Sequence, residues 1–186
     1  MTRRTREYRA IEKHYGDQTA ERSGVPLIRH IDHGLAILAA IGASARARRA
    51  FCLHPLVQAN EDLAASYPRL GTLTDDPRVL ALALEYRHVA NATLSTRPIT
   101  SAADIPLSPL GEVNDMLIAD KVQNRADFEA HHEGTHPRST ELARYFRLWL
   151  ERLGVDEARY AELAVSGREG AAGPRTGRRR RVRRAR

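Results

Sequence analysis

Apolar residues recur at intervals of three and four along most of this 186-residue chain, and no stretch of useful length alternates as a strand would. In the segment 139–153, one helix face would carry Leu142, Tyr145, Phe146, Trp149 and Leu150. The same spacing, together with Gly and Pro stops, predicts helices over residues 3–15, 27–41, 45–53, 78–94, 109–129, 139–153 and 156–165. The expected fold class is therefore all-α, a helical bundle.

The segment around Pro55 is where the helical pattern becomes ambiguous. The helix predicted from residue 45 reaches His54, and its spacing continues beyond Pro55. Proline is poorly tolerated inside a helix because it lacks a backbone N–H, so we expect a kink or a fresh helix start near His54. In a continuous helix, the face that carries His54 would also carry three polar residues, Gln58, Glu61 and Asp62.

The charge of the chain is concentrated at its C-terminal end. The sequence carries 30 Lys and Arg against 23 Asp and Glu, a formal net charge of +7. Residues 168–186 hold nine Arg and one Glu, a charge of +8, which leaves −1 for the rest. Apolar residues make up 42% of the chain, as in ordinary globular proteins. We therefore expect one folded domain over 1–167 and a disordered basic tail over 168–186.

Nothing in the sequence predicts a membrane span or a secretory signal. No run of about 18 apolar residues occurs, and the basic first residues are not followed by an apolar stretch. The single cysteine, Cys52, excludes an internal disulfide and suits a reducing compartment. We therefore expect a cytoplasmic protein with no membrane partner.

Three residues have the side-chain chemistry of a metal site. His30 ends the segment Gly-Val-Pro-Leu-Ile-Arg-His, His54 lies at the end of the next predicted helix, and Asp120 lies in a later one. Neutral imidazole nitrogens and a carboxylate oxygen bind divalent ions that promote phosphate-ester hydrolysis. Taken alone, a histidine in a helix is more often a hydrogen-bonded core or surface residue than a ligand, so the argument depends on all three together.

The order and local context of these residues resemble the HD-domain phosphohydrolases, in particular the RelA/SpoT-type alarmone (ppGpp) hydrolase domains. The segment Gly24–His30 is similar to the stretch that leads to the family's first metal histidine. Residues 117–124, Leu-Ile-Ala-Asp-Lys-Val-Gln-Asn, resemble the family's leucine-alanine-aspartate segment, with an asparagine four residues after the aspartate. The resemblance spans about residues 8–153 and implies an HD-domain-like helical bundle.

This resemblance implies a metal-dependent phosphohydrolase that acts on a phosphate ester or pyrophosphate of a nucleotide, ppGpp-like by analogy. The ion would be Mn²⁺ or a similar divalent metal, held by His30, His54 and Asp120, and it would acidify the attacking water. Asn124 shares a helix face with Asp120 and would orient its carboxylate or bind phosphate. The candidate substrate-binding residues are Arg22, Arg87, Lys121 and Asn124.

The chain departs from the family pattern directly after the second histidine. Family members have a metal-ligating aspartate there, and this chain has Pro55, which cannot ligate. His33, three residues after His30, would supply a replacement ligand from the same helix. Four and five residues after that histidine the family has Glu-Asp, where this chain has Gln58 and Ala59.

Catalysis in this chain would therefore depend on other side chains. Gln58 would orient the water, or one of the acids Glu61 and Asp62 would accept its proton. Along a continuous helix these acids stand about 5 Å beyond the position used by the family. The same departures favour an alternative, a catalytically degenerate HD domain that binds a nucleotide as a sensor, sponge or regulator.

A third interpretation rests on the tail. Arginines gather in residues 175–186, and such an arm would contact nucleic acid weakly, through salt-sensitive contacts with phosphates. The tail has no aromatic residues for base stacking, and its arginine excess is also typical of GC-rich coding. A nucleic-acid accessory role and a merely solvated extension are therefore both open.

Overall fold

The computed structural model describes residues 2–21, 23–95 and 99–171, and these form helices joined by loops. The α-helices are α1 (Arg6–Tyr15), α2 (Ile28–Ala40), α3 (Ala45–Leu53), α4 (Pro55–Gln58), α5 (Asn60–Ser66), α6 (Leu70–Leu73), α7 (Pro77–Ala92), α8 (Gly111–His131), α9 (Ser139–Arg152) and α10 (Glu157–Ala171). Short 3₁₀ helices occur at η1 (Thr2–Arg4), η2 (Tyr67–Arg69) and η3 (Ala102–Asp104). Within the described ranges β-pairing is limited to one bridge, between Thr19 and Pro26. The all-α prediction is confirmed.

The predicted helix bounds agree with the structure to within a few residues, except at the C-terminal end. Helix α10 continues to Ala171, so the predicted start of the tail at residue 168 is wrong. The helix continues because its small residues pack closely on α2, where a Cβ added at Gly170 would lie 2.5 Å from the Cβ of Ala36. The rest of the predicted tail, 172–186, lies outside the described residues. No helix in the described part of the chain is both long and apolar enough to cross a membrane.

The helix that carries His54 ends where proline predicts. Helix α3 ends at Leu53, and Pro55 occupies the first turn of the short helix α4, where its missing N–H costs nothing. A second break follows at Ala59, whose extended backbone (ψ 158°) separates α4 from α5. A continuous helix from residue 45 onward is therefore wrong, and so is the shared helix face that would have placed Glu61 and Asp62 in line with His54.

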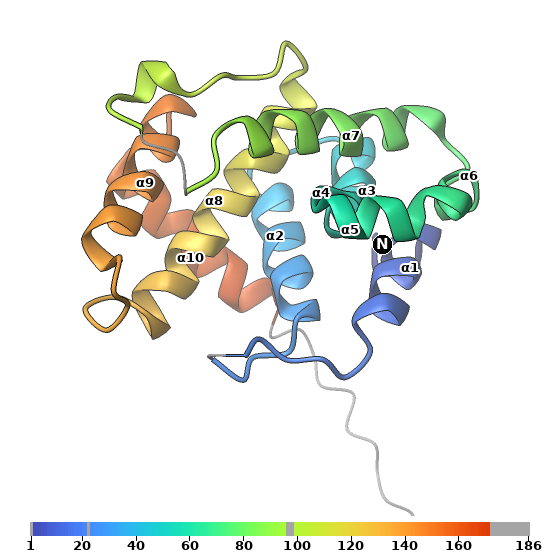
Figure 1. The fold of residues 1–186 in the computed structure, drawn as a ribbon, viewed down its shortest axis with the longest axis horizontal. Coiled ribbons are helices and arrows are strands. Elements are labelled where there is room, and N and C mark those ends of the chain that lie inside the picture. Colours follow the sequence, from blue (N-terminus) through green and yellow to red (C-terminus); the bar gives the residue numbers. More distant parts are fainter. Residues whose placement is uncertain (1, 22, 96–98, 172–186) are drawn as a thin grey trace, which may run out of the picture.

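Helix α2 runs through the middle of the molecule, between α8 and the α3–α4 segment (Figure 1). It packs against α10, α8 and α3, while α7 packs against α3, α4 and α8. The largest fully buried side chains of this core include Trp149 on α9, Tyr86 on α7 and Phe51 on α3. The packing brings the three helices with predicted metal ligands, α2, α3 and α8, against one another.

Helices α2 and α3 approach closely at Gly34. A Cβ added to this glycine would lie 2.2 Å from Cε1 of Phe51, a distance that atoms in contact do not reach. Phe51 is fully buried, so its ring has no free space into which to move. The absence of a side chain at Gly34 therefore lets the two helices that carry His30 and His54 pack at this distance.

A buried ion pair ties α1 to the rest of the bundle. The carboxylate of Glu7 accepts hydrogen bonds from Arg49 on α3 at 2.8 Å and from Thr74 at 2.5 Å, and its side chain is fully buried. Burial by itself would raise the pKa of Glu7, but the hydrogen bonds from Arg49 and Thr74 outweigh that effect and lower this pKa. The ionised carboxylate therefore stabilises the fold.

Replacing Glu7 by Gln is expected to lower the free energy of unfolding at neutral pH by about 1–3 kcal/mol, because charge-assisted hydrogen bonds inside the core are lost. Since folding lowers the pKa of Glu7, its contribution is present above the unfolded-state pKa of about 4.3 and is lost as the pH falls through the folded-state pKa. Urea unfolding between about pH 3 and pH 7 would measure both effects. A difference between wild type and Glu7→Gln that stays constant over this range would contradict the assignment.

Candidate metal centre

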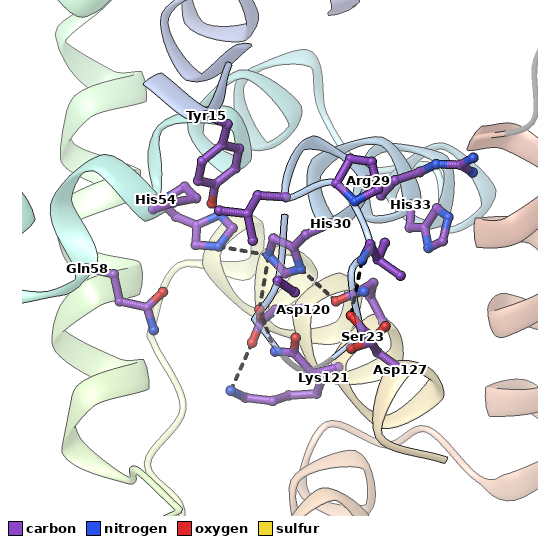
Figure 2. A pocket seen from close by; sticks show the side chains of 17 residues that line it. Tyr15, Ser23, Arg29, His30, His33, His54, Gln58, Asp120, Lys121 and Asp127 are labelled. Carbon is purple, nitrogen blue, oxygen red and sulfur yellow. Dashed lines mark hydrogen bonds and ion pairs between the residues drawn. The ribbon is translucent and has the colours of Figure 1, made fainter. Parts of the chain in front are cut away.

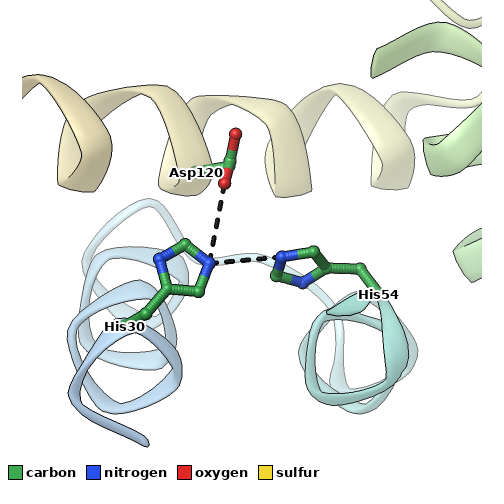
Figure 3. A group of neighbouring side chains, drawn as sticks. All are labelled: His30, His54 and Asp120. Carbon is green, nitrogen blue, oxygen red and sulfur yellow. Dashed lines mark hydrogen bonds and ion pairs between the residues drawn. The ribbon is translucent and has the colours of Figure 1, made fainter. Parts of the chain in front are cut away.

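The three predicted ligands meet in one place. His30 projects from α2, His54 from the end of α3 and Asp120 from the middle of α8 (Figure 3). The two imidazole Nε2 atoms lie 3.2 Å apart, and Oδ1 of Asp120 lies 3.6 Å from Nε2 of His30. One potential ligand atom from each residue lies within 4.8 Å of the others. Three helices thus place two nitrogens and one oxygen around a single point.

Each imidazole makes a hydrogen bond through Nδ1, on the side of the ring away from this point. These hydrogen bonds set the tautomer of each ring, and so decide whether Nε2 presents a lone pair to the point. Nδ1 of His54 lies 2.7 Å from the carbonyl oxygen of Phe51, which can only accept, so this nitrogen carries the proton. Nδ1 of His30 lies 2.6 Å from Oε1 of Gln123 and donates to it. When both rings are neutral, their Nε2 atoms are acceptors that face each other. A cation between them would relieve this repulsion, so the group has the form of a metal ligand set.

Charge and burial keep the ligands in the forms that bind metal. Burial, followed by the neighbouring His30, lowers the pKa of His54 to about 3, so this imidazole is neutral at physiological pH. Burial would raise the pKa of Asp120, but Lys121 and the two histidines together hold it well below its usual range. At physiological pH, His54 is therefore already neutral and Asp120 already ionised, so neither has to release a proton before it binds a metal.

Aromatic rings hold the imidazoles in place. The ring of Phe51 lies 4.6 Å from that of His54 and 5.7 Å from that of His30, measured between centroids. Tyr86 on α7 lies on another side of His54, with 4.8 Å between centroids. Because Phe51 and Tyr86 are fully buried, the orientation of His54 is set by the core itself.

The carboxylate of Asp120 has two further partners on its own helix. Asn124 donates a hydrogen bond to Oδ1 at 2.9 Å, the contact that the four-residue spacing predicts. Nζ of Lys121 lies 2.9 Å from Oδ2, and both side chains are almost completely buried. Lys121 also lies over the ring of Trp149, 5.0 Å from its centroid. Burial alone would lower the pKa of Lys121, but Asp120 raises it to about 12, so the lysine is charged.

The candidate ligands, together with Lys121 and Asn124, line a cavity of about 350 Å³ (Figure 2). Tyr15 and Gln58 lie on one side of the His30–His54–Asp120 group, and Arg29, His33 and Asp127 lie on the other. The volume is within the range of small-molecule sites and is sufficient for a phosphorylated group. Comparison of the chain with protein-family models, with curated proteins and with solved structures finds no match. The site must therefore be interpreted from its own geometry.

The structure brings some of the other predicted site residues into the cavity and leaves others out. Gln58, Lys121 and Asn124 line it, as does His33, although His33 is not part of the three-residue cluster. Glu61 and Asp62 line a neighbouring cavity of about 480 Å³ on the other side of Gln58, because the break at Ala59 turns α5 away. These two acids do not line the cavity that contains the candidate metal ligands.

Two predicted substrate-binding arginines have different outcomes. Arg87 does not line the cavity. Its guanidinium donates to the backbone carbonyl of Gln58 and, at 2.6 Å, to Oδ1 of Asn60, so it holds the junction of α4 and α5. Arg22 lies outside the described residues.

Sequence reasoning missed several residues of the cavity. Tyr15 comes from the end of α1, and Arg29 precedes the first histidine, but neither has a spacing signal that separates it from ordinary helix residues. Gln123 is the most consequential of those missed, because its amide fixes the tautomer of His30. Its only signal was its position within the segment 117–124.

Replacing Gln123 by Leu is expected to weaken divalent-metal binding by about 10- to 100-fold, because His30 loses the acceptor that orients its ring. Gln123→Glu, which keeps an acceptor oxygen, is the matched control and should bind metal at least as well as the wild type. Titration of Mn²⁺ followed by the electron paramagnetic resonance of the free ion would measure both. Equal affinity of the Leu variant and the wild type would show that Gln123 does not orient His30.

Proposed function

We propose that this chain is a metal-dependent phosphohydrolase that acts on a nucleotide phosphate ester or pyrophosphate. The observation that carries the proposal is the facing pair of imidazole Nε2 atoms, 3.2 Å apart and beside an ionised carboxylate. Such a set binds a divalent ion and leaves coordination positions open for water and substrate. The resemblance of the sequence around His30 and Asp120 to the HD-domain hydrolases supports the same class of activity, with a ppGpp-like nucleotide as one candidate substrate.

The residues of the cavity divide the chemistry among them. When bound by His30, His54 and Asp120, a divalent ion such as Mn²⁺ supplies a Lewis acid that polarises a phosphoryl oxygen and acidifies water. Asn124 holds the carboxylate of Asp120 in one orientation, and Lys121 balances its charge. Gln58 has no side-chain hydrogen bond to another described residue, so its amide is available to orient a water.

A second candidate is a nucleotide-binding domain that does not turn its ligand over. The specific observation in its favour is the position of Glu61 and Asp62, which line the neighbouring cavity, with Pro55 in the place of a ligating aspartate. Asp127 lines the metal cavity but lies 3.8 Å from His131, with which it forms an ion pair when that histidine is charged. A general base must stand within hydrogen-bond reach of the water that it deprotonates, so a bound nucleotide without turnover fits this arrangement.

The experiment that separates these candidates compares metal content and turnover. Wild type, His30→Ala and Asp120→Ala would be purified and assayed for bound metal and for product release from a panel of nucleotides with Mn²⁺. His88→Ala removes an exposed histidine of α7 that does not line the cavity and serves as the matched control. If the wild type and His88→Ala bind metal and release product while the two site variants do neither, the hydrolase is supported. If the wild type binds metal but releases no product, the nucleotide-binding domain is supported. Wild type that takes up no Mn²⁺ even in excess metal and with nucleotide present would overturn both.

Two further expectations stay part of the proposal. The cytoplasmic location rests on the single cysteine, which suits a reducing compartment. The weak nucleic-acid contact expected of residues 175–186 is separable, because deletion of residues 172–186 would abolish it and leave the chemistry of the cavity unchanged.

A further inference from the structure

The candidate metal site has an unusual charge balance. Two of its three candidate ligands are imidazoles, which bind metal as neutral groups, so Asp120 supplies the whole negative charge of the set. That charge is already matched, because Nζ of Lys121 lies 2.9 Å from Oδ2 of Asp120. The ligand set together with Lys121 therefore has a net charge of zero before any metal arrives.

Lys121 is held where it is. Its side chain is 7% exposed, and its ammonium lies 5.0 Å from the ring centroid of Trp149 and 5.7 Å from that of Tyr145. Both rings belong to α9, which packs against α8. Moving the ammonium out to solvent would break these contacts and the ion pair together. An incoming dication therefore meets a fixed positive charge one carboxyl group away.

The rest of the cavity does not supply the missing negative charge. Besides Asp120, the one carboxylate among its described lining residues is Asp127, which is partly buried and lies beside His131 rather than in the metal cluster. The cationic Arg29 also lines the cavity. The site thus offers a dication three ligand atoms and no net charge, and it leaves coordination positions open.

From this balance we propose that the divalent ion and a phosphate oxyanion bind cooperatively, and that Lys121 sets the strength of the coupling. The oxyanion supplies both the negative charge and the oxygen ligands that the protein lacks, and Lys121, which lines the cavity, faces it as well. The free protein then holds the metal weakly and takes it up together with a phosphorylated substrate. The inference rests on the proposed metal site and adds that the metal binds to it together with the phosphorylated substrate.

Titration of Mn²⁺ into the full chain, with and without inorganic phosphate, tests the coupling without any assay of turnover. Free Mn²⁺ is read by electron paramagnetic resonance, and a titration without protein corrects for binding of Mn²⁺ to phosphate. Saturating phosphate is expected to tighten Mn²⁺ binding by about 10-fold or more, within the usual range of coupling between two sites. By reciprocity, calorimetry should show Mn²⁺ tightening phosphate binding by the same factor.

Lys121→Met should bind Mn²⁺ about 10-fold more tightly than the wild type when phosphate is absent, and phosphate should then add little. Lys13→Met, which removes the other lysine of the chain from an exposed position on α1, is the matched control and should behave as the wild type. If Lys121→Met does not fold, the two wild-type titrations still decide whether phosphate tightens Mn²⁺ binding. Tight Mn²⁺ binding that phosphate does not change overturns the coupling and leaves the metal site standing. No Mn²⁺ binding under any condition overturns both.

Discussion

Replacing Asp120 by Asn is expected to remove metal binding and to destabilise the fold by about 3–5 kcal/mol. Asparagine has nearly the shape of aspartate but no charge, so Lys121 is left as a buried cation with no counter-ion. The same change removes the single anionic ligand of the cluster. Loss of an orienting group alone weakens metal binding by about 10- to 100-fold, so loss of this ligand should reduce metal affinity by on the order of 100-fold or more.

Chemical unfolding and Mn²⁺ titration of the same samples would separate the two effects. The double variant Asp120→Asn/Lys121→Met removes the stranded charge as well, and it should recover most of the lost stability while metal binding stays absent. If the single variant is as stable as the wild type, the Asp120–Lys121 pair is not buried in the way that α8 and α9 place it.

Replacing Trp149 by Ala should cost about 3–5 kcal/mol of the free energy of unfolding. Its side chain is fully buried and is the largest in the core, so truncation leaves a cavity that the surrounding helices fill only in part. The ring also lies beneath the ammonium of Lys121, and a desolvated cation–π contact contributes about 2 kcal/mol. The substitution therefore weakens both the core and the ion pair of Lys121 with Asp120.

Trp149→Phe is the matched control, because it keeps an aromatic ring beneath the ammonium and loses less volume. Urea unfolding should rank the proteins wild type, Phe variant, Ala variant, with similar m-values if all three unfold in one step. A loss of less than about 1 kcal/mol in Trp149→Ala would mean that α9 contributes little to the core and that Lys121 is not held against it.

The longer helices were predictable because each carries a local signal in the sequence, whereas the short helix α6 was not predicted. The apolar face of α9, the proline at the start of α7 and the proline at the start of α4 are all local features of the sequence. The ligand trio was predictable for a different reason, since the local context of His30 and Asp120 resembles a known family. The structure adds that the three side chains lie close enough to share one ion.

What the sequence did not predict depends on contacts between distant segments. Ala59 breaks the chain between α4 and α5, yet alanine is a good helix former and gives no sign of an extended backbone. Lys121 was predicted as a substrate-binding residue, but the sequence did not predict its burial against Trp149. The extension of α10 to Ala171 depends in the same way on its close packing against α2 at Ala36.

The close approach of α2 and α3 at Gly34 has a consequence for ion choice. The helices that carry His30 and His54 pack closely at the ring of Phe51, which also lies beside both imidazoles, so backbone packing helps to set the spacing between them. An ion in the candidate site would therefore lie between helices that have little room to move closer together. Ionic radius, and not ligand chemistry alone, would therefore select among the divalent cations of the cell.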